Sequence, residues 1–210
     1  MVFTFTVFHY YEKYTITNCD GGKEMNRAMR RTLKEVTEDS KINELLEIAK
    51  VGYLGLNDEE GTYVVPVNFV WKNGKIYFHG SEEGRKVDAM KTSKRVCFTI
   101  TEDKGTVANP APANIGTAYL SVMIFGTLSI VNDLEQATAT LQAMLDKFVP
   151  GYFAEKLAEK YVDAYRSSLG SKTVVYCLKP DQITAKEDNA EKHQLFFPGR
   201  KQQNDLKQDR

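Results

Sequence analysis

A repeating alternation of apolar and polar residues begins at Val51 and constrains the fold of this chain more than any other feature. Three consecutive segments have the two-residue period of a half-buried strand: 51–57 (VGYLGLN), 62–71 (TYVVPVNFVW) and 76–81 (IYFHGS). Asn73-Gly74 separates the last two segments and favours a type I′ hairpin turn, because both turn positions require positive φ. The sequence therefore predicts three consecutive antiparallel strands.

Regular strand spacing continues through the second half of the chain. Further strands are predicted at 95–102, 117–131 and 172–178, the last leading into 183–186, and an Ala- and Pro-rich loop at 107–114 separates the first two. Helical periodicity predicts peripheral helices at 37–50, 82–92, 133–147 and 152–168. Six strands with this spacing favour a mainly β (α+β) fold, an antiparallel and Greek-key-like barrel, rather than a doubly wound parallel sheet.

Pro66 lies inside the second predicted strand. Proline cannot donate a ladder hydrogen bond, so this strand is expected at an edge of the sheet or to carry a bulge. A ligand can approach the backbone at such a position.

The charge balance and the cysteines exclude several kinds of partner. Lys and Arg number 28, as do Asp and Glu, so the whole chain has no electrostatic reason to bind nucleic acid or an anionic membrane. Cys19, Cys97 and Cys177 form no C-x-x-C pair, which argues against a zinc site or paired disulfides and favours a reducing cytoplasm. No apolar run reaches the roughly 18 residues of a membrane span, and the N-terminus lacks the features of an export signal. We therefore expect no metal, nucleic-acid or membrane partner.

The length of 210 residues suits one domain with extensions. Residues 1–28 alternate aromatic, Thr and Val residues before they turn polar, and we interpret them as an N-terminal extension. Residues 29–186 carry the six predicted strands and form the domain. Residues 187–210 are charged and rich in Gln, so a C-terminal tail is expected.

The clearest candidate for a ligand site is the segment from Tyr77 to Lys86 (YFHGSEEGRK), where a strand runs through small residues into a helix start. The N–H groups and the dipole of a helix N-terminus favour an anion, while Arg85 adds a planar fork and Lys86 a point charge. Ser81 can cap the helix or donate to a phosphate oxygen, and Gly84 allows close approach of the backbone. The alternative is a basic turn exposed to solvent, and the residues alone leave both interpretations open.

The same segment, preceded by YVVPVNF and followed by RVCFTI, resembles the nitroimidazole-resistance-related branch of the pyridoxamine-phosphate-oxidase-like flavoproteins. The similarity extends from about Arg30 to Lys186 and includes Tyr119-x-Ser121-Val122-x-x-Phe125-Gly126 and Ile183-Thr184-Ala185-Lys186. It implies an FMN-binding split β-barrel that forms a homodimer with FMN at the subunit interface.

The resemblance also implies roles for particular residues. Arg85 and Lys86 would hold the FMN phosphate, with Ser81 and Ser121 as hydroxyl donors, and Gly84 and Tyr119 also belong to the implied cofactor-binding set. Four residues of one strand would line the edge of the isoalloxazine ring, chiefly through backbone groups: Val65, Pro66, Val67 and Asn68. His79 would face the flavin or the substrate as the candidate catalytic residue, orienting the substrate or supplying a proton. Haem, with His79 as an axial ligand, is the alternative cofactor.

The implied function is that of an FMN-dependent oxidoreductase, which takes reducing equivalents from NADH or NADPH and passes them to a small electron-poor acceptor such as a nitroaromatic. The cofactor supplies the redox chemistry, which agrees with the lack of a catalytic triad or metal set in the sequence. A flavin- or haem-binding protein without a dedicated substrate is the alternative. Pyridoxamine phosphate oxidation is less favoured, because no second Arg-rich phosphate site is evident.

Overall fold

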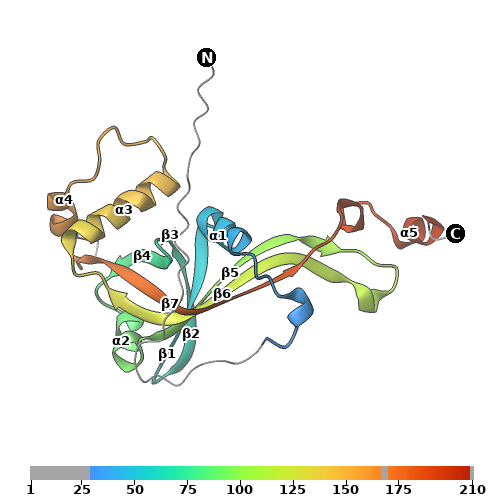
Figure 1. Cartoon of the computed structure of the whole chain (residues 1–210), viewed down its shortest axis with the longest axis horizontal. Helices are drawn as coiled ribbons and strands as arrows, with labels where there is room; N and C mark the ends of the chain where they lie inside the picture. Colours follow the sequence, from blue (N-terminus) through green and yellow to red (C-terminus); the bar gives the residue numbers. More distant parts are fainter. Residues whose placement is uncertain (1–28, 167–169, 209–210) are drawn as a thin grey trace, which may run out of the picture.

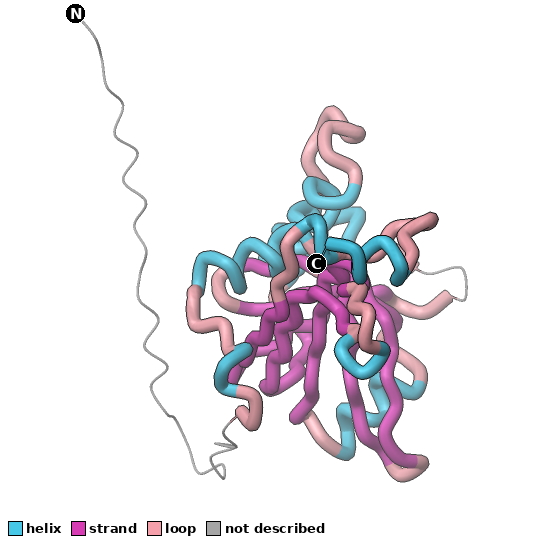
Figure 2. Tube along the Cα trace, turned by 90° about the vertical axis from the view of Figure 1, so that its right-hand side faces the viewer, coloured by secondary structure: helices cyan, strands magenta, loops and turns pink. Residues whose placement is uncertain are grey.

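The computed structural model describes residues 29–166 and 170–208, and the extension expected at 1–28 lies outside them. Its centre is one antiparallel sheet with the strand order β2-β1-β5-β6-β7-β4-β3 (Figures 1 and 2). The strands are β1 (Val51–Asp58), β2 (Gly61–Asn68), β3 (Val70–Lys72), β4 (Lys75–Ser81), β5 (Arg95–Val107), β6 (Gly116–Ile130) and β7 (Thr173–Asp188). The predicted mainly β fold is confirmed.

A single residue, Phe69, joins β2 and β3, which are the two edge strands of the sheet. The sheet must therefore curve until its edges approach each other, which gives a barrel split between two strands. Phe69 is fully buried at this junction. The structure has seven strands where six were predicted, because segment 62–71 divides here. The expected edge position of Pro66 is confirmed, since it lies in β2.

The turn between β3 and β4 has the geometry that its sequence predicts. Asn73 has a φ of 52° and Gly74 a φ of 70°. Positive φ at both central positions is the type I′ geometry. The flanking strands pair directly from Lys72 and Lys75, so the turn sets the register of β4.

Two helices pack into the barrel and a third covers part of its outer face. The helices are α1 (Asp39–Ile48), α2 (Arg85–Thr92), α3 (Leu134–Phe148), α4 (Glu159–Ala164) and α5 (Gln202–Gln208), with 3-10 turns η1 (Thr32–Lys34), η2 (Pro112–Asn114) and η3 (Lys192–Gln194). The helices predicted at 37–50, 82–92 and 133–147 are confirmed by α1, α2 and α3. Among the residues described, no helix has the length and apolar character needed to cross a bilayer.

The helix predicted at 152–168 is mostly wrong: of the described residues 152–166, those from 159 to 164 form a helix, α4. Residues 167 and 168 lie outside the described part of the chain. Pro150 and Gly151, with a φ of 72°, turn the chain away after α3. Tyr152 and Phe153, which follow this turn, are 77% and 55% exposed. Their rings pack on no core surface formed by the described residues, so burial of an apolar face would not stabilise a helix at this point.

The hydrophobic core lies inside the barrel. Phe78, Phe98 and Ile124 are fully buried there, and Leu46 of α1 and Ala89 of α2 belong to the same cluster. A smaller cluster lies outside the barrel, where α3 packs on β3, β4 and β7. Because α2 packs against the barrel interior, the first turn of this helix lies beside the end of β4.

A long hairpin of β5 and β6 continues past the barrel (Figure 1). The residues expected to form a tail extend β7 to Asp188 and then return to the end of β5. Leu195 pairs there with Val107, and the N–H of Phe196 donates to the carbonyl of Thr106 at 2.7 Å. Backbone pairing therefore ties the segment after β7 to this hairpin.

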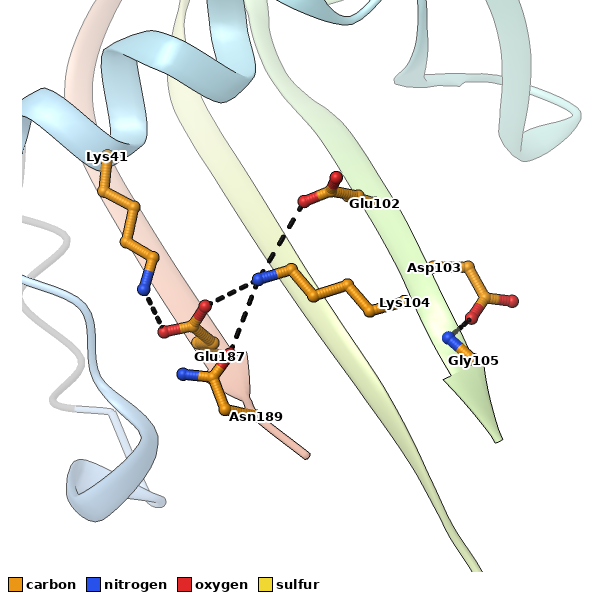
Figure 3. Close-up of polar contacts among 7 residues, drawn as sticks. All are labelled: Lys41, Glu102, Asp103, Lys104, Gly105, Glu187 and Asn189. Atoms are coloured by element: carbon orange, nitrogen blue, oxygen red, sulfur yellow. Dashed lines mark hydrogen bonds and ion pairs between the residues drawn. The ribbon is translucent and has the colours of Figure 1, made fainter. Parts of the chain in front are cut away.

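An ion cluster ties α1 to β5 and β7 (Figure 3). Glu187 of β7 accepts hydrogen bonds from Lys41 of α1 and from Lys104 of β5, the latter at 2.7 Å. The Glu187 side chain is only 10% exposed. Desolvation by itself would raise the pKa of this carboxyl, but the bonds from the two lysines outweigh it and lower the pKa to about 2.

We expect Glu187→Gln to lower the free energy of unfolding by about 2 kcal/mol at pH 7, because two lysines lose their carboxylate. The folded pKa lies below the ordinary value of 4.5, so this contribution is complete above that pH and is lost as the pH falls toward 2. Urea unfolding should therefore show a difference from wild type that shrinks by more than half at pH 3. The same change at the exposed Glu59 is the control, and an equal difference at both pH values would contradict this account.

Candidate functional site

The junction of β4 and α2 brings five predicted site residues into one short segment: His79, Ser81, Gly84, Arg85 and Lys86. Gly84 is the N-cap of α2 and has a φ of 102°, a conformation that favours glycine. It has no side chain with which to cap the helix. The N–H groups of Val87 and Asp88 donate to the carbonyl of Gly84, at 2.8 and 3.2 Å, and those of Arg85 and Lys86 have no acceptor among the described residues. Free N–H groups at a helix N-terminus suit an anion.

Lys86 is a half-buried cation above two aromatic rings. Its Nζ lies 4.4 Å from the ring centroid of Tyr176 and 5.5 Å from that of Phe78, and these rings stack at 5.1 Å. The ammonium also occupies the space beside Gly80, where a Cβ atom would collide with it. No carboxylate of the described residues lies within 4.0 Å of Nζ. Desolvation lowers the pKa of Lys86. Within the described ranges, a half-buried positive charge therefore has no anion beside it.

Arg85, the neighbouring cation, points to a different part of the molecule. Its Nε and one terminal nitrogen donate to the carboxylate of Asp58 at 2.7 and 3.1 Å, and the other terminal nitrogen lies 3.6 Å from Glu60. Its guanidinium also lies 4.4 Å from the ring centroid of Tyr63. Arg85 thus joins the β1–β2 turn to the start of α2, and its predicted role as a phosphate ligand stays a prediction.

Ser81 organises the chain between β4 and α2. Its hydroxyl accepts a hydrogen bond from the N–H of Glu83 at 3.0 Å and donates to the hydroxyl of Ser171 at 3.1 Å. Its carbonyl accepts from the hydroxyl of Tyr176 at 2.5 Å, and burial raises the pKa of Tyr176 to about 12. Tyr176 is therefore neutral under Lys86 at ordinary pH. The hydroxyl of Ser81 lies where β4 ends and the connection to α2 begins.

His79 lies on the outer face of β4, opposite Val175 of β7. It is an exposed residue, yet partial desolvation of its ring, followed by the charge of Lys86, lowers its pKa below the ordinary value of 6.5. The imidazole is therefore neutral at pH 7. No carboxylate within the described ranges pairs with it, so the arrangement suits hydrogen bonding or metal ligation better than general base catalysis.

Val65, Pro66, Val67 and Asn68 lie together on the edge strand β2. Val65 and Val67 pack against the core, while Pro66 and Asn68 point to the exposed face. An edge strand has one row of backbone groups without a strand partner. This placement is consistent with the predicted backbone contacts to a ligand.

Tyr119 and Ser121 lie far along the sheet from the predicted residues at the junction of β4 and α2. Ser121 of β6 pairs with Lys186 near the end of β7, whereas Ser81 of β4 pairs with Thr173 at the start of β7. One chain therefore does not bring these two half-buried residues to the start of α2.

A family model described as pyridoxamine 5'-phosphate oxidase matches residues 38–187, which is more than half of the chain. The chain belongs to this family. The matched residues run from the N-cap of α1 into the end of β7, and so contain β2, the β4–α2 junction and β6. No curated protein sequence matches the chain.

Solved structures share the fold of this pyridoxamine 5'-phosphate oxidase family member. The flavocytochrome Anf3 of Azotobacter vinelandii has a TM-score of 0.67 at 18% identity, over 84% of this chain and 81% of that one. The FAD and haem binding protein of Mycobacterium smegmatis has a TM-score of 0.62 at 20% identity, over 75% and 77%. A protein of Bacteroides thetaiotaomicron described as a 5-nitroimidazole antibiotic resistance protein has a TM-score of 0.56 at 23% identity, over 72% and 85%.

A cavity of about 270 Å³ lies elsewhere in this family member, lined by Glu47, Val70, Trp71, Lys72, Ala143 and Lys147. None of the predicted cofactor residues lines it. Lys147 donates to the carbonyl of Ala49 at 2.6 Å, at the end of α1, and burial lowers its pKa to about 8. This contact fits a lysine that caps a helix C-terminus. We therefore assign this cavity no part in the family's cofactor site.

Three residues of the site were missed by the sequence analysis: Asp58, Tyr63 and Tyr176. Asp58 is the last residue of β1 and carries no motif, and the two tyrosines lie inside the segments predicted as strands at 62–71 and 172–178. The one sequence signal concerns Tyr63: it alternates in step with Val65 and Val67, whose side chains face the core. Contacts between β2, α2 and β7 reveal their position, and these contacts depend on the curvature of the sheet.

Proposed function

We propose that this family member is a flavin-binding oxidoreductase that holds FMN by its phosphate at the junction of β4 and α2. The observation that carries the proposal is Lys86, a half-buried ammonium over two aromatic rings with no carboxylate within 4.0 Å among the described residues. A desolvated cation without an anion is unfavourable. A phosphate at this position would remove that cost.

The groups around Lys86 suit a phosphate because they are donors. They comprise the N–H groups of Arg85 and Lys86 at the start of α2 and the ammonium itself. The hydroxyl of Ser81 would join them by giving up its hydrogen bond to the hydroxyl of Ser171. The flavin, when bound, supplies the redox chemistry. The chain's own residues bind and orient it, with the unpaired edge of β2 from Val65 to Asn68 offered to the ring.

His79 is the candidate catalytic residue in this proposal. Its neutral imidazole on the outer face of β4 is able to donate one hydrogen bond and accept another, and so to orient a substrate beside the flavin. Because it has no carboxylate partner in the described part of the chain, we assign it orientation of the substrate rather than proton abstraction.

The known binding partners of the similar structures, as their descriptions give them, support this choice of function. Two are described as a flavocytochrome and as an FAD and haem binding protein, and the third as a 5-nitroimidazole antibiotic resistance protein. We infer a small nitroaromatic compound as the electron acceptor and NADH or NADPH as the donor. We also infer a cytoplasmic location, with which the free thiols of Cys97 and Cys177 agree.

A homodimer is part of the proposal. Tyr53, Val64 and Met123 are 48%, 60% and 39% exposed on the outer face of β1, β2 and β6, which leaves an apolar surface without a cover. Tyr119 and Ser121 lie too far along the sheet to join Lys86 within one chain. A second copy seated on this face would offer its own residues to the site.

Rapid mixing of the purified, FMN-loaded chain tests the proposed function. We expect NADH or NADPH to bleach the bound flavin anaerobically, and a nitroimidazole to restore its absorbance, each at least about tenfold faster than with free FMN. Loss of all flavin on desalting would contradict the proposal. Bound flavin that neither nucleotide reduces would favour a binding protein without a dedicated substrate.

Haem is the second candidate cofactor, and the neutral state of His79 favours it. Metal ligation requires an unprotonated imidazole nitrogen, which this residue has at pH 7. Titration with haemin should then give a spectrum that changes in the His79→Ala variant. A spectrum that is identical in both proteins would remove His79 as the ligand.

A further inference from the structure

The side chain of Tyr63 packs against the barrel core beside the start of α2, and its hydroxyl is shielded from solvent. Its Oη atom is buried and has no hydrogen-bond partner among the described residues. Desolvation is the main cause that raises the pKa of this hydroxyl, so it is a neutral donor at ordinary pH. A buried hydroxyl without a partner is unfavourable for folding and is uncommon in native proteins.

The ring of Tyr63 is held in place by a chain of charged contacts. The guanidinium of Arg85 lies 4.4 Å from the ring centroid, and the same guanidinium donates two hydrogen bonds to the carboxylate of Asp58. These contacts connect the β1–β2 turn, β2 and the start of α2. The orientation of the hydroxyl is therefore fixed before any ligand arrives.

Tyr63 and Lys86 both lie next to the start of α2, because Arg85, whose guanidinium lies over the Tyr63 ring, directly precedes Lys86 in the helix. Lys86 lies over the ring of Tyr176, and Tyr63 packs against the same core cluster to which Tyr176 belongs. Burial, then the charge of Glu82 and then Tyr63 raise the pKa of Tyr176. Within the described ranges, a neutral donor without an acceptor and a cation without an anion therefore lie near the same end of α2. An ionised phosphate monoester has the acceptor oxygens and the charge that satisfy both groups.

We propose that Tyr63 is a further cofactor-binding residue, which donates from Oη to a phosphate oxygen of the ligand whose charge Lys86 neutralises. Arg85 and Asp58 are positioning residues in this arrangement, because they hold the tyrosine ring rather than the ligand. The inference rests on the proposed function, since it takes the phosphate of FMN as the ligand group. It adds a contact that distinguishes a phosphorylated flavin from riboflavin.

The full-length Tyr63→Phe variant tests this inference, because it removes one oxygen and keeps the ring under Arg85. Fluorescence titration should give an FMN dissociation constant raised about tenfold or more, the effect expected when a hydrogen bond to a charged group is lost. The affinity for riboflavin, which has no phosphate, should not change. The melting temperature of the ligand-free variant should be equal to or above that of wild type, since an unpaired buried hydroxyl is gone.

Tyr161→Phe is the matched control, because Tyr161 is 62% exposed on α4 and also has a cation, the ammonium of Lys160, 5.0 Å from its ring centroid. Unchanged FMN affinity in Tyr63→Phe, or an equal loss for FMN and riboflavin, would overturn the inference while leaving the proposed function intact. A wild-type chain that binds neither flavin would instead overturn the proposed function.

The positioning role of Asp58 is tested by a double-mutant cycle. Asp58→Asn should weaken FMN binding severalfold in wild type, and it should have little further effect when Tyr63 is already Phe, because both changes remove one contact. If Asp58→Asn weakens FMN binding by the same factor in both backgrounds, Asp58 acts on the ligand site by another route, and its assignment as a positioning residue is overturned.

Discussion

Replacing Gly126 by Ala is expected to lower the free energy of unfolding by about 3 kcal/mol or more, a large share of the stability of a domain of this size. Gly126 lies in β6 at a β-bulge, where the partner strand skips from Gln182 to Pro180. A Cβ atom there would overlap the carbonyl oxygen of Lys179 and lie 2.9 Å from its carbonyl carbon. The collision is with backbone, so no side-chain rotation relieves it.

The bulge has little freedom to adjust around an added methyl group. Pro180 restricts the backbone opposite Gly126. The fully buried side chain of Leu178, two residues earlier in β7, borders the same space. Urea unfolding of the purified variant measures the effect. Gly116→Ala is the matched control in the same strand, because a Cβ atom there meets nothing within 4 Å. Similar stabilities for the two variants would contradict the predicted collision.

Replacing Lys86 by Met is expected to weaken FMN binding by about 30-fold or more, which corresponds to roughly 2 kcal/mol for a charge-assisted contact in a partly buried site. Methionine keeps most of the length and apolar contact of the side chain above Tyr176. The ligand-free variant should be at least as stable as wild type, because it no longer buries an unpaired cation. Calorimetric titration with FMN, and thermal unfolding without it, measure the two effects.

The pH dependence of binding follows from the same residue. Desolvation lowers the pKa of Lys86 in the ligand-free chain, and a bound phosphate would raise it again. The wild-type affinity should therefore fall as the pH rises through the lowered pKa, because the amine then loses its charge, whereas Lys86→Met should show no such fall. Lys91→Met, on the exposed side of α2 next to Asp88, is the control. Equal affinities for all three proteins would remove Lys86 from the site.

Local rules predicted much of the fold. The Asn73-Gly74 turn and the edge position of Pro66 both follow from backbone chemistry that acts over a few residues. The division of one predicted strand at Phe69 did not follow, because it depends on the sheet closing round that residue. The helix predicted after Gly151 was mostly wrong for a related reason, since its apolar residues find no core to cover.

The candidate site was predicted only as a segment, not as an arrangement. Arg85 and Lys86 are neighbours in sequence and were given one role, yet successive helical residues point about 100° apart. Arg85 therefore meets Asp58, while Lys86 reaches over Tyr176. Spacing along a strand likewise did not reveal that Ser121 lies far from Ser81.

By itself, the sequence determined the strand periods, the tight turns and the presence of two cations at the start of a short helix, because each depends on residues close together in the chain. Only the tertiary structure decided which of these cations meets a carboxylate of the described residues and which does not, and that the buried hydroxyl of Tyr63 has no acceptor in that part of the chain. The physical reason is that the curvature of one sheet brings β2, α2 and β7 together, and burial then decides which charges and donors are left without partners.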